Sequence, residues 1–175
     1  NVICRYKKEY CLHEYIPYFV EYMSLNNKKY NKGKCNLSNF KNLKKLRLNI
    51  SVPLSVMIPN NLEYLKFGDN FAGDFILPEK NSLKVLIFGK KHKLPLNGKL
   101  RNTKLKVLYL GYSFNSSLVN ELPETLEYLD INRCFKQDLT DILPPNLKYL
   151  SFNGGRYNHH LTKIPDLDQV DMNCE

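Results

Sequence analysis

The sequence of 175 residues lacks the features that mark several classes of protein. It contains no run of roughly 18 apolar residues, which a membrane-spanning helix requires, and no secretory signal peptide opens it. Its five cysteines are scattered and form no Cys-x-x-Cys pair, which is atypical of a disulfide framework or a zinc site. Cys4 and Cys11 are near enough in sequence to meet across a loop, although spacing alone does not decide it. We therefore expect a non-membrane protein of a reducing compartment, the cytoplasm, with mostly buried thiols.

Motifs of catalysis and metal binding are missing as well. There is no Gly-x-Ser-x-Gly, no His-Glu-x-x-His and no Walker-type phosphate loop. The pair His159-His160 has no carboxylate or cysteine at a ligand spacing. The acidic residues near the C-terminus lack the glycine and the bidentate glutamate of a calcium loop. We expect a protein that is not an enzyme and that holds no metal or other cofactor.

The sequence does contain a repeat. The segment LPETLEYLDINRCF (122–135) recurs, with substitutions, as LPPNLKYLSFNGGRY (143–157). Alignment on the first residue of Leu-x-x-Leu-x-apolar recovers eight copies, 19 to 23 residues apart. We call this first residue the opener of each copy. The openers are Val20, Leu43, Leu62, Leu83, Leu105, Leu126, Leu147 and Leu167.

Each copy predicts one short strand. The residues three and five places after the opener are never charged, and side chains two apart in a strand share a face, so both point inward. The next residue is always Asn or Gly, which favours a left-handed backbone or a tight turn. Most copies close on Ile-Pro or Leu-Pro, which leaves no room for a long helix. A period of about 21 residues is typical of leucine-rich repeats.

These observations predict an α/β-type leucine-rich-repeat solenoid, a horseshoe or arc of about eight coils. A parallel sheet would line its concave face, and irregular or 3₁₀ segments would form most of the convex side. We expect one repeat domain over 1–175, with a partial N-terminal coil or cap at 1–15, and eight coils at 16–175, the last of them truncated. Because such ends expose core, we also expect a longer array or ends that are covered by self-association.

Two copies, LEYLKFGDNFAGDFILP (62–78) and LKVLYLGYSFNSSLVNELP (105–123), resemble the FNIP-repeat family of leucine-rich repeats. The family pattern runs Leu-x-x-Leu-x-Phe-Gly-x-x-Phe-Asn and then Leu-Pro; Ala72, Val52 and His92 depart from it. Such repeats occur in social amoebae and in giant viruses of protists, often behind an F-box. The resemblance implies a protein-binding adapter that supplies the substrate-recognition part of a ubiquitin ligase, although no segment here reads as an F-box. A viral origin would add the virion as an alternative location to the cytoplasm.

Residues two and four places after each opener should face outward on the concave side. In the middle and later copies they form an apolar and tyrosine-rich set, which is typical of binding surfaces. The predicted partner-binding residues are Tyr64, Val85, Ile87, Val107, Tyr109, Tyr128 and Tyr149. The alternative is a tyrosine ladder that only stiffens the sheet.

Charge is polarised along the chain. The net charge of +9 is made of +8 in residues 1–48, +6 in 49–120 and −5 in 121–175. Lys44, Lys45, Arg47 and Lys66 form a candidate basic patch on the concave face. The lysines of NNKKYNKGK (26–34) and KKHK (90–93) fall on return loops rather than on one aligned face, so we expect a protein partner and not nucleic acid. The rival to a binding module is a structural protein that assembles through its coil ends, in a virion for example.

Overall fold

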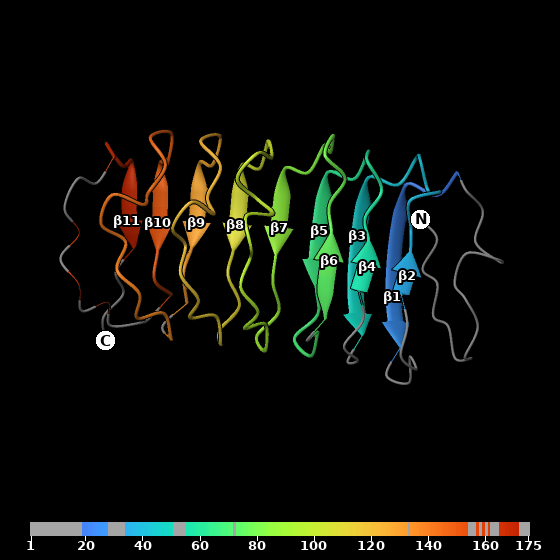
Figure 1. Ribbon diagram of the computed structural model, residues 1–175, viewed down its shortest axis with the longest axis horizontal. Helices are drawn as coiled ribbons and strands as arrows, with labels where there is room; N and C mark the ends of the chain where they lie inside the picture. Colours follow the sequence, from blue (N-terminus) through green and yellow to red (C-terminus); the bar gives the residue numbers. More distant parts are fainter. Residues whose placement is uncertain are drawn as a thin grey trace.

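A computed structural model describes residues 19–27, 34–50, 55–71, 73–132, 134–153, 157, 159, 161 and 165–171. Expectations about residues 1–15, including the N-terminal cap and the Cys4–Cys11 pair, lie outside these ranges. Eight parallel strands form one sheet and follow one another along the long axis of the molecule (Figure 1). The strands, in sheet order, are β1 (Tyr22–Asn27), β3 (Lys45–Ile50), β5 (Tyr64–Phe67), β7 (Val85–Ile87), β8 (Val107–Tyr109), β9 (Tyr128–Asp130), β10 (Tyr149–Ser151) and β11 (Gln169–Asp171).

The repeated leucines form a continuous interior row. Leu65 is in register with Leu86, Leu86 with Leu108, Leu108 with Leu129, and Leu129 with Leu150. All five side chains are completely buried. Burial of a leucine side chain contributes about 1.5–3 kcal/mol, so this row is a main source of stability. The stacking predicted from the repeat is confirmed for these coils.

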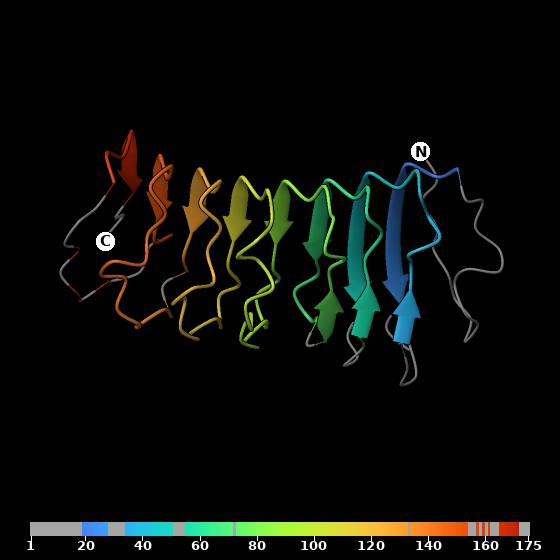
Figure 2. The same ribbon diagram turned by 45° about the horizontal axis from the view of Figure 1, so that its top comes forward.

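A second, smaller sheet lies on the return side of the first coils (Figure 2). It joins β2 (Lys34–Asn36), β4 (Ser55–Met57) and β6 (Asp74–Ile76), all parallel. Val56 and Phe75 are in register and buried between the two sheets. The return side was expected to hold irregular or 3₁₀ segments, so these three strands were not predicted. The described part of the chain contains no helix, neither α nor 3₁₀, so the α/β-type label is wrong there and the return side consists of strands, turns and extended segments.

The predicted tight turn begins at Gly68, Gly89, Gly111 and Asn132. At Asn26 and Asn49 the predicted corner is wrong, because β1 and β3 continue through these residues. The amide of Phe71 donates to the carbonyl of Gly68 at 3.0 Å, and the amide of Phe114 donates to Gly111 at 2.9 Å. The left-handed backbone is wrong at these glycines, since Asn153 (φ 43°) alone among the corner residues in the described ranges has a positive φ. Glycine is required for a different reason. A Cβ on Gly89 would lie 2.0 Å from the Gly68 carbonyl oxygen, so successive coils approach too closely for a side chain.

A row of stacked rings fills the core behind the turns. Ring centroids are 6.2 Å apart between His92 and Phe114 and 6.3 Å apart between Phe114 and Phe135, with nearly parallel planes. His92, the departure from the aromatic pattern, therefore takes the place of a phenylalanine. Its ring also stacks on Phe88 at 4.0 Å and is only 2% exposed. We call Phe71, His92, Phe114 and Phe135 the aromatic row.

Burial makes His92 unusual. Neither ring nitrogen has a hydrogen-bond partner among the described residues, although the Leu94 backbone lies near enough to favour the protonated ring. Desolvation lowers the pKa of His92 to about 4, against a weaker opposing effect of the nearby Asp74 carboxylate. The ring is therefore neutral at physiological pH.

Candidate functional site

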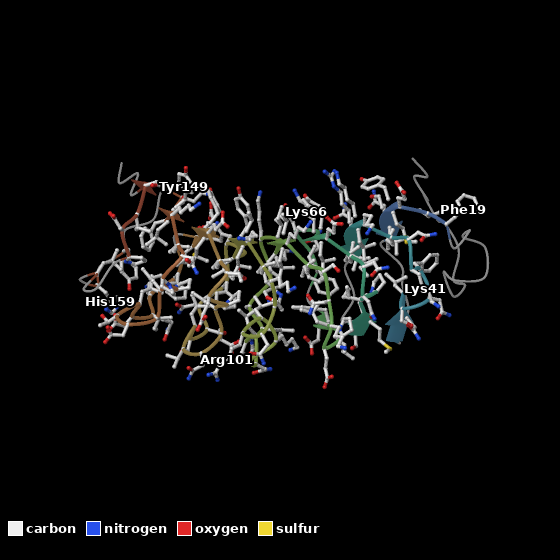
Figure 3. The ribbon with its side chains drawn as sticks, turned by 90° about the horizontal axis from the view of Figure 1, so that it is seen from above. Phe19, Lys41, Lys66, Arg101, Tyr149 and His159 are labelled. Carbon is white, nitrogen blue, oxygen red and sulfur yellow. The ribbon has the colours of Figure 1, made fainter. Side chains whose placement is uncertain are left out.

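The water-facing side of the eight-stranded sheet carries every residue of the predicted binding set. We call this side the outer sheet face. One row of register partners follows the residues two places after the openers, and a second row follows the residues four places after them. From β5 to β10 the first row is Tyr64, Val85, Val107, Tyr128 and Tyr149, and the second is Lys66, Ile87, Tyr109, Asp130 and Ser151. Figure 3 shows Lys66 and Tyr149 on one side of the molecule, with Arg101 and His159 on the other.

The centre of this face is apolar. Val85 is the register partner of Val107, and Ile87 is the partner of Tyr109. All four side chains are partly exposed. They form one contiguous spot across β7 and β8, because parallel strands lie about 4.8 Å apart. A water-accessible apolar spot of this kind is what a binding surface needs at its centre.

Tyrosine rings extend the spot towards the C-terminal coils. The Tyr109 and Tyr128 ring centroids are 5.1 Å apart with planes tilted by 34°, and those of Tyr128 and Tyr149 are 6.1 Å apart with a tilt of 35°. Such contacts stabilise neighbouring strands by about 0.2–1 kcal/mol each. The predicted ladder is therefore present, and the same rings keep part of their surface open to water, Tyr149 most of all at 39% exposed.

The basic residues divide into two groups. Lys45, Arg47 and Lys66 lie on the outer sheet face and are exposed, with Arg47 and Lys66 in register on adjacent strands. Lys44 precedes β3 and belongs to another row, where its Nζ lies 3.5 Å from an oxygen of Glu63. The patch predicted from sequence thus loses Lys44, whose charge is paired.

That other row follows the residue directly after each opener, and its residues other than Lys44 were not among those predicted from the sequence. Its charges alternate in sign, apart from the neighbours Lys84 and Lys106: Glu21, Lys44, Glu63, Lys84, Lys106, Glu127, Lys148 and Asp168. Glu63 lies 2.9 Å from Lys84, and Glu127 pairs with both Lys106 and Lys148. Hydrogen bonds from Lys84 and Lys106 hold the pKa values of Glu63 and Glu127 below their usual range. Inspection of this one column of the repeat would have found the row, which largely neutralises itself.

Hollows that are lined by described residues include the following two. The first, about 500 Å³, adjoins the outer sheet face at β1, β3 and β5. Its lining is mostly polar: Ser24, Arg47, Leu48, Asn49, Lys66, Gly68, Asp69 and Asn70.

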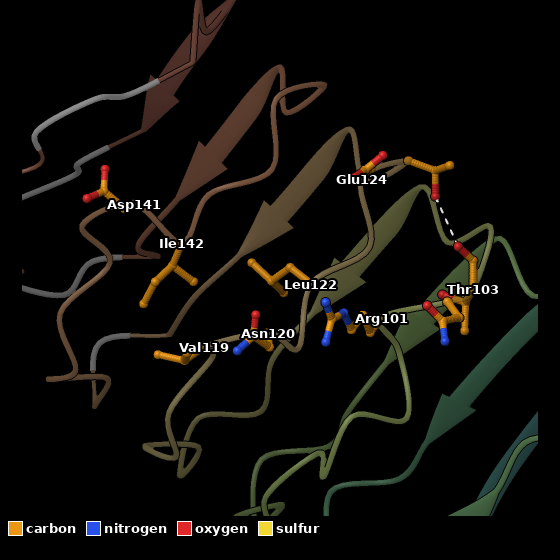
Figure 4. Close-up of a pocket in the computed structure, with 10 residues that line it drawn as sticks. Arg101, Thr103, Val119, Asn120, Leu122, Glu124, Asp141 and Ile142 are labelled. Carbon is orange, nitrogen blue, oxygen red and sulfur yellow. Dashed lines mark hydrogen bonds between the residues drawn. The ribbon is translucent and has the colours of Figure 1, made fainter.

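The second hollow, about 660 Å³, lies at the bends of the return side (Figure 4). Arg101, Leu122 and Ile142 line it from three successive coils. Asn120 and Asp141, both at φ 57°, form turns in its wall, a conformation that Asn and Asp tolerate better than most residues. Its mixed lining and its position away from the apolar spot make it the weaker candidate for a protein-binding site.

The described residues also bear on metal binding and on membrane crossing. Within those ranges, no three His, Cys, Asp or Glu side chains gather where they could hold a metal ion. His159 lies with its Nε2 2.8 Å from the Lys136 carbonyl oxygen, on the exposed return side; its neighbour His160 lies outside the described ranges. The same part of the chain contains no helix of the length and apolarity that crossing a membrane would need.

The stacked parallel strands define the fold as a repeat solenoid. A family model, the FNIP Repeat, matches residues 53–91, which confirms the resemblance noted in the sequence. The structure is similar to the crystal structure of CroV588, a circular LRR protein of a giant virus (CroV), with a TM-score of 0.51 and 19% sequence identity. The match covers 95% of this chain and 35% of that one, so the chain spans about a third of that protein's length. A search of curated proteins gives no significant sequence match.

Proposed function

We propose that this chain is a non-enzymatic protein-interaction module that binds a partner protein on its outer sheet face. The observation that carries the proposal is the contiguous, partly exposed spot of Val85, Ile87, Val107 and Tyr109, continued by the tyrosine rings of β9 and β10. Exposed apolar surface rimmed by polar groups is typical of interaction sites, and tyrosine is enriched among residues that dominate binding energy. The rigid, stacked strands would hold this surface in shape before a partner arrives, which lowers the entropic cost of binding.

A double variant tests the proposal. Val107→Thr with Tyr109→Ser replaces apolar surface on the outer sheet face by polar groups, while the buried Leu108 between them is kept. A matched control is Val119→Thr, an exposed position (56%) at the bends of the return side. We expect the double variant to lose a partner that the wild-type chain and the control retain in quantitative affinity purification from the native cell. Thermal unfolding shows whether each variant is folded; a folded double variant that keeps the partner contradicts the proposal.

A finer proposal concerns the partner's fate. FNIP repeats often occur behind an F-box, so we propose that the bound protein is a substrate of a ubiquitin ligase. This chain would then be the part of the ligase that recognises the substrate. The purification above tests this extension, because ligase subunits should then accompany the chain when the full-length gene product is used as bait. Purifications that yield the partner without ligase subunits, and unchanged partner levels when the gene is deleted, would remove it. The cytoplasm is the compartment that goes with this role.

Self-association is the second candidate. It is supported by the similarity of nearly the whole chain to about a third of a circular LRR protein, because a solenoid of this kind could continue into a larger assembly, a virion component for example. Light scattering coupled to size-exclusion chromatography at several concentrations tests it. A molecular mass that rises with concentration favours assembly, whereas a constant monomer mass with a foreign partner bound favours the interaction module.

A further inference from the structure

The polar hollow beside β1, β3 and β5 adjoins the proposed binding face. It contains two cations, Arg47 and Lys66, on adjacent strands and in register. Since neighbouring strands are about 4.8 Å apart, one small anion can contact both side chains. Among the described residues, neither cation forms an ion pair with a carboxylate, in contrast to the paired lysines of the neighbouring charge row.

The rest of the hollow supplies hydrogen-bond donors and little opposing charge. Ser24, the register partner of Arg47, contributes a hydroxyl, and Asn49 and Asn70 contribute side-chain amides. The one carboxylate in the lining is Asp69. Its Oδ1 accepts a hydrogen bond from the Lys90 amide at 3.3 Å and its Oδ2 lies 3.7 Å from Lys90 Nζ, so its charge is offset from the next coil.

We propose that Arg47 and Lys66 bind the phosphate group of a phosphorylated side chain on the partner protein. A phosphate dianion offers three acceptor oxygens, enough for the arginine fork, the lysine and a hydroxyl or amide together, whereas a single carboxylate would satisfy fewer of these donors. The inference rests on the proposed function, because the phosphate belongs to a protein whose apolar residues would lie on Val85 and Ile87, the two strand positions that follow.

Charge along the outer sheet face favours this occupant over nucleic acid. Past Lys66 the second row continues with Ile87, Tyr109, Asp130 and Ser151, none of which is a cation. A nucleic-acid strand presents a phosphate at every nucleotide and needs cations along its whole path. A peptide with one phosphate needs them at one point and apolar surface beyond it, which is the arrangement here.

The test is a titration of the whole chain with N-acetyl-O-phosphoserine amide and with the unphosphorylated compound, followed by ¹H–¹⁵N NMR at constant ionic strength. We expect the phosphorylated compound alone to shift the amide signals of Asn49, Gly68 and Asn70. Arg47→Gln with Lys66→Gln should weaken its binding by about tenfold or more, since charge-assisted hydrogen bonds are lost. The control, Lys80→Gln with Lys93→Gln, removes two exposed lysines outside the hollow and should leave binding unchanged.

Three results would overturn the inference: equal shifts with both compounds, equal weakening by the two pairs of variants, or tighter binding of a ten-nucleotide oligothymidylate that depends on Tyr64. The last result would make the face a nucleic-acid site. The Val107→Thr/Tyr109→Ser variant separates this inference from the proposed function, because these residues lie outside the hollow. If partner capture needs Val107 and Tyr109 but not the two cations, the phosphate anchor fails and the interaction module stands. If phosphoserine binding needs the cations while capture does not need Val107 and Tyr109, the hollow binds phosphate but the proposed binding face fails, and with it the assignment of the phosphate to a partner on that face.

Discussion

Replacement of His92 by phenylalanine tests how the aromatic row is built. The imidazole is stacked between Phe88 and Phe114, and both of its nitrogens are buried without partners in the described part of the structure. Because Phe71 and Phe114 occupy the same place in the adjacent coils, a phenylalanine ring suits the geometry of the row. At pH 7 we expect His92→Phe to be neutral or stabilising, since an unsatisfied buried polar group costs about 1–3 kcal/mol and overpacking can offset part of the gain.

The burial of His92 also makes the free energy of unfolding of the wild-type protein depend on pH. The pKa of His92 is lowered from 6.5 to about 4 in the folded protein, so the unfolded chain binds a proton between these values that the folded chain does not. The free energy of unfolding of the wild type must therefore fall as pH falls from about 6.5 to about 4. Linkage gives a loss of about 2.5 kcal/mol at a pH of about 4.5 and about 3 kcal/mol near pH 4, from 1.36 kcal/mol per pKa unit.

Urea unfolding of both proteins at several pH values between about 4.5 and 7.5 measures this loss. Carboxylates that do not act on the pKa of His92, such as Glu63 and Glu127, are present in both proteins and cancel in the difference. We expect the difference in unfolding free energy, His92→Phe minus wild type, to grow by about 2.5 kcal/mol as the pH falls. A difference that stays flat would show that His92 is solvated or hydrogen-bonded, and would refute the description of the row.

Three further predictions concern the stacking of the coils. Gly89→Ala should destabilise the protein severely, because the new Cβ would lie 2.0 Å from a carbonyl oxygen of the preceding coil. Gly98→Ala (φ 72°, open space) should cost only about 1–2 kcal/mol of unfolding free energy. Equal losses of the two variants in urea unfolding would contradict the close approach of the coils. Leu108→Ala should cost about 2–5 kcal/mol by the same assay, and a loss below 1 kcal/mol would mean that the interior row is not tightly packed. Glu127→Gln should lower the melting temperature slightly, and the difference from the wild type should disappear in about 1 M salt, because the partners of Glu127, Lys106 among them, are exposed. A difference that persists in salt would mean that Glu127 stabilises the coils by contacts other than its ion pairs.

The sequence predicted the stacked sheet well, because a hydrophobic period is a property of the chain itself. Leu86 and Leu108 occupy matching places in two copies, and matching places in a solenoid must lie in one row. The outer sheet face followed from the same alignment, since side chains alternate along a strand. All seven residues of the predicted binding set lie on that face.

What the sequence did not predict depends on distances between coils. The corner glycines looked like residues for a left-handed backbone, yet Gly89 is required by the approach of the Gly68 carbonyl, which only the three-dimensional stacking shows. The pairing of successive return arms into the second sheet, β6 among them, likewise depends on contacts between coils. The pairing of Lys44 with Glu63 removed one predicted member of the basic patch, because the registry of neighbouring coils decides which charges meet.

Site-specific photo-crosslinking tests the central claim, partner binding on the outer sheet face, most directly. Tyr109 replaced by p-benzoylphenylalanine places the reactive group on the apolar spot, and the same residue in place of Val119 places it at the bends of the return side. We predict that irradiation in the native cell links one and the same protein to position 109 and not to position 119. No cross-link at 109, or the same products from both positions, would contradict the account.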